Sequence, residues 1–232
     1  MVTFGLVHGG FHGGWCWDHL VPELEALGHD SVTMDMPIDR ADATLQDYVD
    51  SVVDALADVD GPVVMVGHSM GGLVIPHVAL ARPVEHMVFI CAMYDEDNLP
   101  EVPEGVEIPD LERLNFDMSL LSVDAGFTTV DREGAKGAFF PDCDPADAEW
   151  AVAQLKPQGH APAIALVAPW PDVASTLIVC TDDRGTEHTR RCIAPRLGVE
   201  PVELPGGHSP FLSRPAHLAQ VLDEVASTVP AS

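Results

Sequence analysis

Lysine is almost missing from this chain. Only Lys136 and Lys156 occur among its 232 residues, and 11 lysines and arginines stand against 37 aspartates and glutamates, which gives a formal net charge of −26 at neutral pH. A surface this acidic repels nucleic acid and anionic lipid, so we expect neither of them as a partner. The charge favours solubility and says little about a substrate.

The sequence also lacks long apolar runs, a secretory leader and a cysteine framework. No apolar run reaches the roughly 18 residues that a membrane-spanning helix needs, and residues 1–5 carry no basic segment of the kind that begins a signal peptide. The five cysteines show no C-x-x-C spacing, and an odd, scattered set of this kind is typical of reduced thiols. We therefore expect a cytoplasmic protein whose cysteines form neither disulfides nor a metal site.

Strand-like and helix-like segments alternate along most of the chain. Short apolar runs predict strands at residues 2–7, 31–34, 63–66, 86–92, 176–180 and 200–204. Helical periodicity predicts helices at residues 17–27, 44–57, 70–82 and 216–228. Pro76 lies inside the third helix and predicts a kink or a missing hydrogen bond. The alternation indicates an α/β fold with a mostly parallel sheet and helices on both faces.

The alternation fails between residues 93 and 174. This stretch is rich in prolines and acidic residues, yet it is too long and too apolar for a linker. We predict that it forms an inserted helical cap. On this division residues 1–93 are the first part of the core, 94–174 the cap and 175–232 the second part of the core, a size that suits one domain with an insertion.

A G-x-S-x-G sequence carries the main catalytic signal. Residues 67–71 read Gly-His-Ser-Met-Gly, directly after a predicted strand and directly before a predicted helix. A strand that turns this sharply into a helix leaves its central residue strained and its side chain exposed, and the flanking glycines remove side chains that would collide. Ser69 is therefore the candidate nucleophile, with the amino end of a helix beside it.

A serine hydroxyl needs a base, and the base needs a third group to orient it. His208 lies on a glycine-rich loop at residues 206–210, before the last predicted helix, and is the candidate base. Asp182 and Asp183 follow the predicted strand 176–180, and we choose Asp183 as the acid. Asp182 is its competitor, and Asp95, which follows the strand at 86–92, is a second alternative.

The reaction also needs two N–H donors aimed at the charge that develops on the carbonyl oxygen, each typically worth ~10²–10³ in rate. The amide of Met70, next to the serine, is one candidate. The other is expected in the glycine-rich loop at residues 8–14, where Gly10 is the candidate donor. Phe11 and His12 in this loop are candidate substrate contacts. A phosphate-binding loop is disfavoured because G-x-G-x-x-G and a following Lys-Ser/Thr are both missing.

Three segments together, residues 8–17, 67–72 and 206–210, resemble compact α/β hydrolases, most closely the plant methylesterase and hydroxynitrile lyase group and its bacterial relatives. The order serine, acid, histidine is also the one expected for that fold. The resemblance covers almost the whole chain and is weakest through the cap. It implies a triad of Ser69, His208 and Asp183, no cofactor, no catalytic metal, and a small ester or cyanohydrin bound under the cap.

Two departures separate the branches of that group. The lyases carry a threonine two residues before the loop cysteine and a lysine just after the catalytic histidine, and these positions here look like Gly9 and Ser209. Without the lysine, a leaving cyanide has no evident cation to stabilise it. The departures therefore favour ester hydrolysis.

We predict a serine hydrolase, either a carboxylesterase or a lactonase, that cleaves a small, largely apolar ester through an acyl-enzyme. The alternatives are a hydroxynitrile lyase-like activity, a biosynthetic hydrolase, thioesterase or cyclase, and a hydrolase-fold receptor without turnover. A homodimer is compatible with the sequence. Five apolar cap residues are candidate substrate contacts, although each could equally pack the cap onto the core: Phe116, Leu120, Leu121, Phe140 and Trp150.

Overall fold

The computed structural model describes residues 1–110, 117–159 and 169–230. Within them, six parallel strands form the central sheet in the order β2-β1-β3-β4-β8-β9, which confirms the predicted fold class. The strands are β1 (Thr3–Val7), β2 (Asp30–Thr33), β3 (Val63–His68), β4 (His86–Ile90), β8 (Ser175–Cys180) and β9 (Val202–Leu204).

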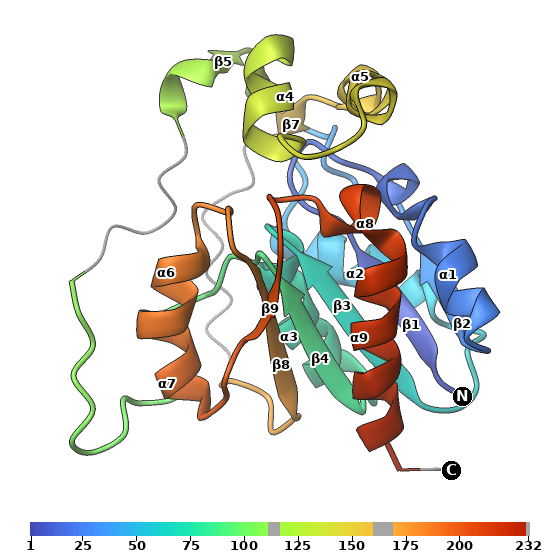
Figure 1. Cartoon of the computed structure of the whole chain (residues 1–232), viewed down its shortest axis with the longest axis vertical. Helices are drawn as coiled ribbons and strands as arrows, with labels where there is room; N and C mark the ends of the chain where they lie inside the picture. The colour runs from blue at the N-terminus through green and yellow to red at the C-terminus, as the bar shows by residue number, and fades with distance from the viewer. Residues whose placement is uncertain (111–116, 160–168, 231–232) are drawn as a thin grey trace.

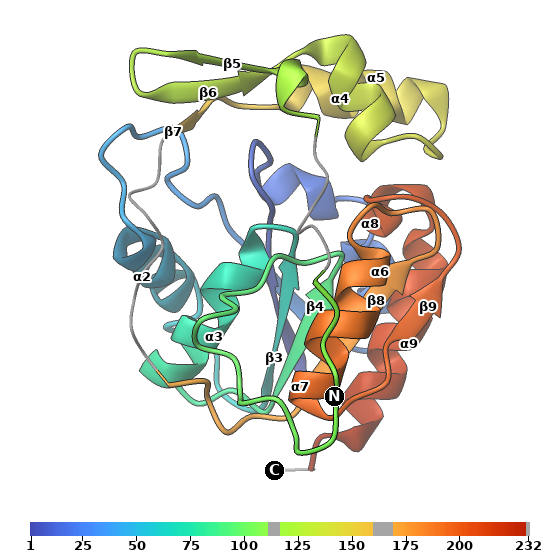
Figure 2. The same ribbon diagram turned by 90° about the vertical axis from the view of Figure 1, so that its left-hand side faces the viewer.

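Helices cover both faces of this sheet (Figures 1 and 2). Val64 and Val66 of β3 belong to the core that also holds α1 and α9, whereas Met65 between them belongs to the core that holds α2 and α3. This alternation follows from the two-residue period of a strand. The core helices are α1 (Val21–Ala26), α2 (Leu45–Ala55), α3 (Gly71–Ala81), α6 (Thr186–His188), α7 (Ala194–Leu197), α8 (Pro210–Ser213) and α9 (Pro215–Thr228), with a 3-10 turn η1 (Gly14–Trp17) and a π turn η3 (Thr189–Ile193).

The two helices that flank β3 in sequence, α2 and α3, carry distinct local sequence features. α2 begins at a capping box, in which the Thr44 hydroxyl accepts from the amide of Asp47 and the Asp47 carboxylate accepts from the amide of Thr44. α3 continues through Pro76, which has no N–H to donate within the helix. In the described ranges, no helix is both long and apolar enough to cross a bilayer.

The cap contains a small sheet as well as helices, and the sequence analysis did not predict that sheet. Ala125 and Gly126 have φ angles of 48° and 86° and form a two-residue turn between the paired residues Asp124 and Phe127. Left-handed geometry at both turn positions matches the twist of a hairpin. The cap elements are η2 (Met118–Leu120), β5 (Leu121–Asp124), β6 (Phe127–Val130), α4 (Arg132–Phe139), α5 (Pro145–Gln154) and β7 (Gln158–Gly159).

The sheet order places two loops together at its centre. β1 and β3 are neighbours, but the chain runs from β1 to β2 at one edge and from β3 through β4 and β8 to β9 at the other. Loops that leave two such strands diverge and open a crevice for a ligand. The glycine-rich loop 8–14 follows β1, and Ser69 follows β3. The cap elements α4, α5, β5 and β7 lie at the top of Figure 1, above the sheet.

Candidate active site

Ser69 occupies a strained turn between β3 and α3. Its φ angle is +50°, in the left-handed region that residues other than glycine rarely adopt, as the G-x-S-x-G pattern predicted. The turn is held from both sides, because the Ser69 amide donates to Ile90 O at 3.1 Å and the Ser69 carbonyl accepts from the amides of Gly72 at 3.0 Å and Met93 at 2.8 Å. The neighbouring strand β4 therefore supports the strain.

The glycines on either side of Ser69 are required by close backbone packing. A Cβ atom on Gly67 would lie 2.8 Å from the carbonyl oxygen of Gly71, and one on Gly71 would lie 2.5 Å from the carbonyl oxygen of Val7. A side chain at Gly67 would push the start of α3 away from β3, and one at Gly71 would push it away from β1. The two glycines thus let α3 start directly against the first strand of the sheet.

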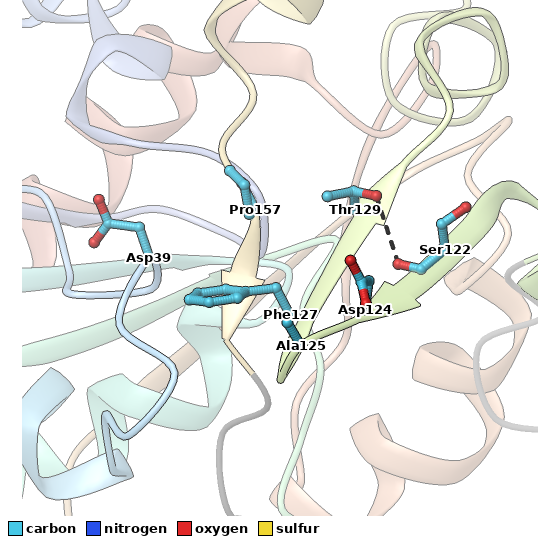
Figure 3. A pocket seen from close by; sticks show the side chains of 7 residues that line it. All are labelled: Asp39, Ser122, Asp124, Ala125, Phe127, Thr129 and Pro157. Atoms are coloured by element: carbon cyan, nitrogen blue, oxygen red, sulfur yellow. Dashed lines mark hydrogen bonds between the residues drawn. The ribbon is translucent and has the colours of Figure 1, made fainter.

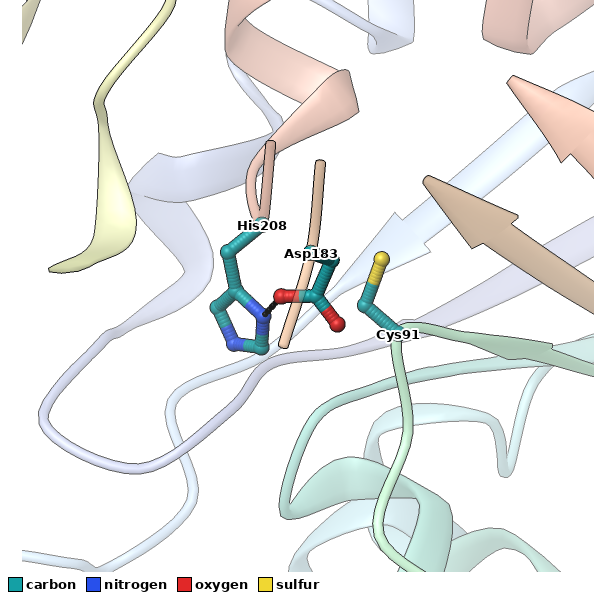
Figure 4. Close-up of side chains that lie close together, drawn as sticks. All are labelled: Cys91, Asp183 and His208. Atoms are coloured by element: carbon teal, nitrogen blue, oxygen red, sulfur yellow. Dashed lines mark hydrogen bonds and ion pairs between the residues drawn. The ribbon is translucent and has the colours of Figure 1, made fainter. Parts of the chain in front are cut away.

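His208 and Asp183 form a buried pair. The Nδ1 atom of His208 lies 2.7 Å from Oδ1 of Asp183, and each side chain is only 8% exposed. Burial alone would raise the pKa of Asp183, but the His208 ring and the amides of Gly185 and Arg184 outweigh it and hold that pKa below its ordinary value. Figure 4 shows the imidazole and carboxylate facing each other, with the second ring nitrogen turned away from Asp183.

The side chains of the two other candidate acids, Asp182 and Asp95, which both lie in the described ranges, do not hydrogen-bond to His208. Asp182 is exposed, and its amide rather than its side chain reaches the histidine loop, by donating to Gly206 O at 2.9 Å. Asp95 accepts from the side chain of Asn98 at 2.7 Å. Of the three carboxylates, all within the described chain, only Asp183 hydrogen-bonds to His208.

His68, which the sequence analysis did not single out, joins the serine turn to the histidine loop. Its Nε2 donates to the backbone carbonyl of His208 at 3.0 Å, and the centres of the two rings lie 4.7 Å apart. Burial, reinforced by the nearby rings of His208 and His12, lowers the pKa of His68 well below its ordinary value, so the ring stays neutral. No hydrogen bond joins Ser69 directly to His208 among the described contacts, and His68 provides the connection between their loops.

Two further histidines fix the carbonyls of the glycine-rich loop. His8 donates from Nδ1 to Gly9 O at 2.8 Å and accepts from the amide of Met36 at 3.0 Å. His12 donates from Nδ1 to Gly10 O at 2.7 Å. Burial lowers the pKa of His8 to about 4 and that of His12 to about 3, so both rings are neutral. His8 was not singled out from the sequence, although its position beside the loop glycines was an available signal. His12 was predicted to contact a substrate, and that contact stays a prediction.

The amides of Gly10 and Met70 have no hydrogen-bond partner within the described residues. The loop that carries Gly10 packs on the serine turn, because a Cβ atom on Gly9 would lie 2.9 Å from both Ser69 Cβ and His68 Nδ1. The neighbouring amide, that of Phe11, is occupied by the side chain of Gln158 at 3.2 Å. The geometry therefore leaves the two amides that the sequence analysis named available for a ligand.

Aromatic side chains of the cap lie against this loop. Phe11 stacks on Phe139 with ring centres 6.2 Å apart, and Phe139, which was not among the predicted contacts, lies 5.9 Å from the His208 ring. His12 lies 5.7 Å from Phe140, and Trp150 meets Trp15 edge-on at 5.3 Å.

These contacts show Phe140 and Trp150 packing the cap onto the core. Leu120 packs against α4, where a Cβ atom on Gly134 would collide with it, and Leu121 begins β5. Phe116 lies outside the described residues. Contact of any of these side chains with a substrate stays a prediction.

Cys91 lies beside the histidine and aspartate (Figure 4). Its Sγ and the side-chain ligand atoms of Asp183 and His208 all lie within 4.8 Å of one another. A hydrogen bond with Cys180 and burial raise the pKa of the Cys91 thiol well above its ordinary value. Because a metal needs a thiolate, and because His208 and Asp183 already bind each other, this group does not fit a metal site.

A cavity of about 330 Å³ lies beside the cap hairpin and contains none of the candidate catalytic residues. In Figure 3 the ring of Phe127 lies below the side chains of Asp39 and Pro157 at this cavity. The lining residues are Asp39, Ser122, Asp124, Ala125, Phe127, Thr129 and Pro157.

A serine at a strand-to-helix turn, followed along the chain by a hydrogen-bonded acid and histidine, is the order of an α/β hydrolase. The alpha/beta hydrolase family model matches residues 6–221, and the chain belongs to this family. Methylesterase 2 of Arabidopsis thaliana is 34% identical over 146 aligned positions, which cover 52% of this chain and about half, 54%, of the relative. Salicylic acid-binding protein 2 of Nicotiana tabacum is 27% identical over 264 positions, 96% of both chains.

Solved structures show the same fold. Polyneuridine aldehyde esterase superposes with a TM-score of 0.75 at 20% identity, covering 97% of this chain and 99% of that one. A pyrethroid hydrolase from Sphingobium faniae JZ-2 superposes with a TM-score of 0.73 at 24% identity, covering 98% of each. At these identities the likeness establishes the architecture alone.

Proposed function

We propose that the protein is a serine hydrolase that cleaves a small, largely apolar, uncharged carboxylic ester or lactone. The observation that carries this is the 2.7 Å bond between His208 Nδ1 and Asp183 Oδ1, buried at the end of the sheet where Ser69 stands on its strained turn. A carboxylate on Nδ1 fixes the tautomer in which Nε2 carries a lone pair. That nitrogen is then able to accept a proton from a serine hydroxyl.

In the proposed mechanism Ser69 Oγ attacks the carbonyl carbon while His208 Nε2 takes its proton. The amides of Gly10 and Met70 bind the resulting oxyanion. His208 then gives the proton to the leaving alcohol, and water hydrolyses the acyl-enzyme by the same steps. The direct bond between Ser69 and His208 forms in the substrate complex, since such bonds commonly tighten only there.

Two observations support ester cleavage over cyanohydrin cleavage. Ser209, at the position where the lyases carry a lysine, is completely buried, and its hydroxyl offers no cation to stabilise a leaving cyanide. Several relatives are named as esterases.

The test is hydrolysis of p-nitrophenyl acetate and butyrate by the wild type and by Ser69→Ala, with Ser227→Ala on α9 as a matched surface control. We expect turnover to vanish in Ser69→Ala and to persist in Ser227→Ala, with unchanged circular dichroism in both. Turnover that survives in Ser69→Ala would overturn the proposal. Cyanide release from mandelonitrile, lost in Ser69→Ala, would favour the lyase activity instead.

A further inference from the structure

The segment that leaves the cap binds Phe11 on both sides of its backbone. The Phe11 amide donates to Oε1 of Gln158 at 3.2 Å, and its carbonyl accepts from the amide of Lys156 at 2.8 Å. Phe11 has a φ angle of +64°, so the loop holds a non-glycine residue in a strained conformation at this point. The cap and the glycine-rich loop are thus connected directly, across 147 residues of sequence.

These contacts orient the peptide next to the candidate oxyanion donor. The peptide between Gly10 and Phe11 is fixed at both ends, because its carbonyl accepts from His12 at 2.7 Å and its amide donates to Gln158. The preceding carbonyl, Gly9 O, accepts from His8 at 2.8 Å. With these three groups held, the Gly10 amide has one orientation. Of these three groups, only the Phe11 amide is bound by a residue of the cap. Loss of the hydrogen bond to Gln158 would free that amide.

Gln158 is itself held in place. Its Nε2 donates to the hydroxyl oxygen of Tyr48 at 3.0 Å, and Tyr48 is 1% exposed on α2. Burial raises the pKa of Tyr48, so the phenol stays neutral. The two partners also assign the amide, since an N–H of Phe11 requires the oxygen of Gln158 and leaves the nitrogen for Tyr48.

The chain that follows β2 also contacts the cap segment, and through Asp35 it contacts the glycine-rich loop as well. Lys156 Nζ lies 2.7 Å from Asp35 Oδ2, and the other oxygen of Asp35 accepts from the amide of Gly14 at 2.7 Å. The amide of Gly159 donates to Ile38 O at 2.6 Å. The cap segment 156–159 therefore runs along the loop that it orients, and Gln158 is the member of that segment whose side chain reaches it.

We propose that Gln158 is a positioning residue for catalysis, which holds the Gly10 amide toward the oxyanion by binding Phe11 and which makes the oxyanion site depend on the cap. The inference rests on the proposed function. In the described part of the chain, the hydrogen bonds of the Gln158 side chain go to Phe11, Tyr48 and Gly159 and none goes to Ser69, so Gln158 acts through the Gly10–Phe11 peptide. Its loss affects the transition state more than the bound substrate, because the charge on the oxygen develops only during reaction.

The test compares Gln158→Met, which keeps the side-chain length and removes the acceptor, with Gln154→Met at the exposed end of α5 as a matched control. We expect kcat for p-nitrophenyl butyrate to fall by about 10-fold or more in Gln158→Met, less than the ~10²–10³ of losing a donor outright. KM should change little. Tyr48→Phe removes the hydroxyl that accepts from Gln158 and should also lower kcat, by a smaller factor.

A transition-state analogue separates positioning from mere packing. A trifluoromethyl ketone forms a tetrahedral oxyanion on the serine, whereas the matched methyl ketone stays trigonal. In Gln158→Met the affinity for the trifluoromethyl ketone should fall by the same factor as kcat/KM, while that for the methyl ketone stays constant. A purely structural role would lower the melting temperature and leave the ratio of the two affinities unchanged.

The outcomes distinguish this inference from the proposed function. If folded Gln158→Met keeps wild-type kcat and ketone affinity while Ser69→Ala is inactive, the positioning role is wrong and the hydrolase stands. If wild-type turnover does not depend on Ser69, the proposed function itself is wrong. Should Gln158→Met not fold, Tyr48→Phe carries the test, and unchanged kcat and ketone affinity in that variant contradict the role.

Discussion

His208 donates from Nδ1 to Oδ1 of Asp183 across 2.7 Å, between two side chains that are each 8% exposed. The other oxygen of Asp183 accepts from the amide of Gly185 at 3.1 Å. The carboxylate is therefore anchored on one side and directs the imidazole on the other. Both the rotation of the ring and the position of its proton are set before any substrate binds.

Asp183→Asn tests this pair. An asparagine keeps the shape but presents an amide N–H to His208, which reverses the ring tautomer. We expect kcat for an aryl ester to fall by about 10⁴-fold, the loss typical of this change in a Ser-His-Asp triad. Steady-state hydrolysis by the purified, folded variant gives the value. Asp182→Asn is the control, and its kcat should stay near that of the wild type. If kcat falls further in Asp182→Asn than in Asp183→Asn, the acid has been misassigned.

Gly9→Ala tests the packing of the loop on the serine turn. Its Cβ would lie 2.9 Å from Ser69 Cβ, so one of the two segments must move. We expect a destabilisation of about 1–3 kcal/mol, as for other overpacked sites, together with a lower kcat. Urea unfolding and steady-state hydrolysis measure the two effects.

Gly137→Ala is the matched control, because Gly137 lies inside α4 with nothing within 4 Å of an added Cβ. There the same substitution should stabilise the protein by about 0.5–1 kcal/mol through helix propensity. Equal behaviour of the two alanine variants would contradict the close approach at Gly9.

The buried neutral histidines predict a loss of stability in mild acid. Burial lowers the pKa of His12 from its ordinary 6.5 to about 3, so between these values the unfolded chain binds more protons than the folded one. The unfolding free energy therefore rises with pH over that window, by at most about 1.4 kcal/mol per pH unit from His12. The contribution of His12 to stability is fully present above pH 6.5.

His12→Asn isolates that contribution from the titration of the carboxylates. Asparagine can still donate to Gly10 O but does not titrate. We expect the wild type to be the more stable at pH 7.5 and its advantage in urea unfolding to shrink at pH 6 and again at pH 5. An advantage that stays constant across this series would show that His12 is not buried as a neutral ring.

The acidic surface predicts stabilisation by salt. With a net charge of −26, like charges repel across the folded surface, and NaCl shortens the range of that repulsion from about 10 Å at 0.1 M to about 3 Å at 1 M. A gain of 1 kcal/mol would raise the melting temperature by about 2–4 °C in a chain of this size. Thermal scans between 0.1 and 1 M NaCl measure the shift. A melting temperature that falls with salt would contradict the prediction.

Local signals were sufficient to predict the serine turn and the sheet. The strain at Ser69 and the packing of Gly67 on Gly71 both arise within five residues of sequence, so the G-x-S-x-G pattern is enough to predict them. The choice between Asp182 and Asp183 was harder, since adjacent loop residues point in different directions and only the folded chain shows which one meets His208.

Features made by distant segments could not be predicted in the same way. The bond of Gln158 to the amide of Phe11 spans 147 residues, and nothing near either residue indicates it. The cap hairpin has a local signal, the turn at Ala125 and Gly126 between short β-branched runs, but the surrounding prolines and acidic residues obscured it. Local patterns therefore predict the residues of the proposed triad, but they do not show how the cap holds the loop beside them.

The most direct measurement of the central claim is labelling with a fluorophosphonate, followed by intact mass and peptide mapping. We expect one adduct per chain, located on Ser69. It should form rapidly in the native wild type, slowly in His208→Gln and not at all after denaturation. A native protein that hydrolyses esters while Ser69 stays unlabelled, or that carries its adduct on another residue, would contradict it.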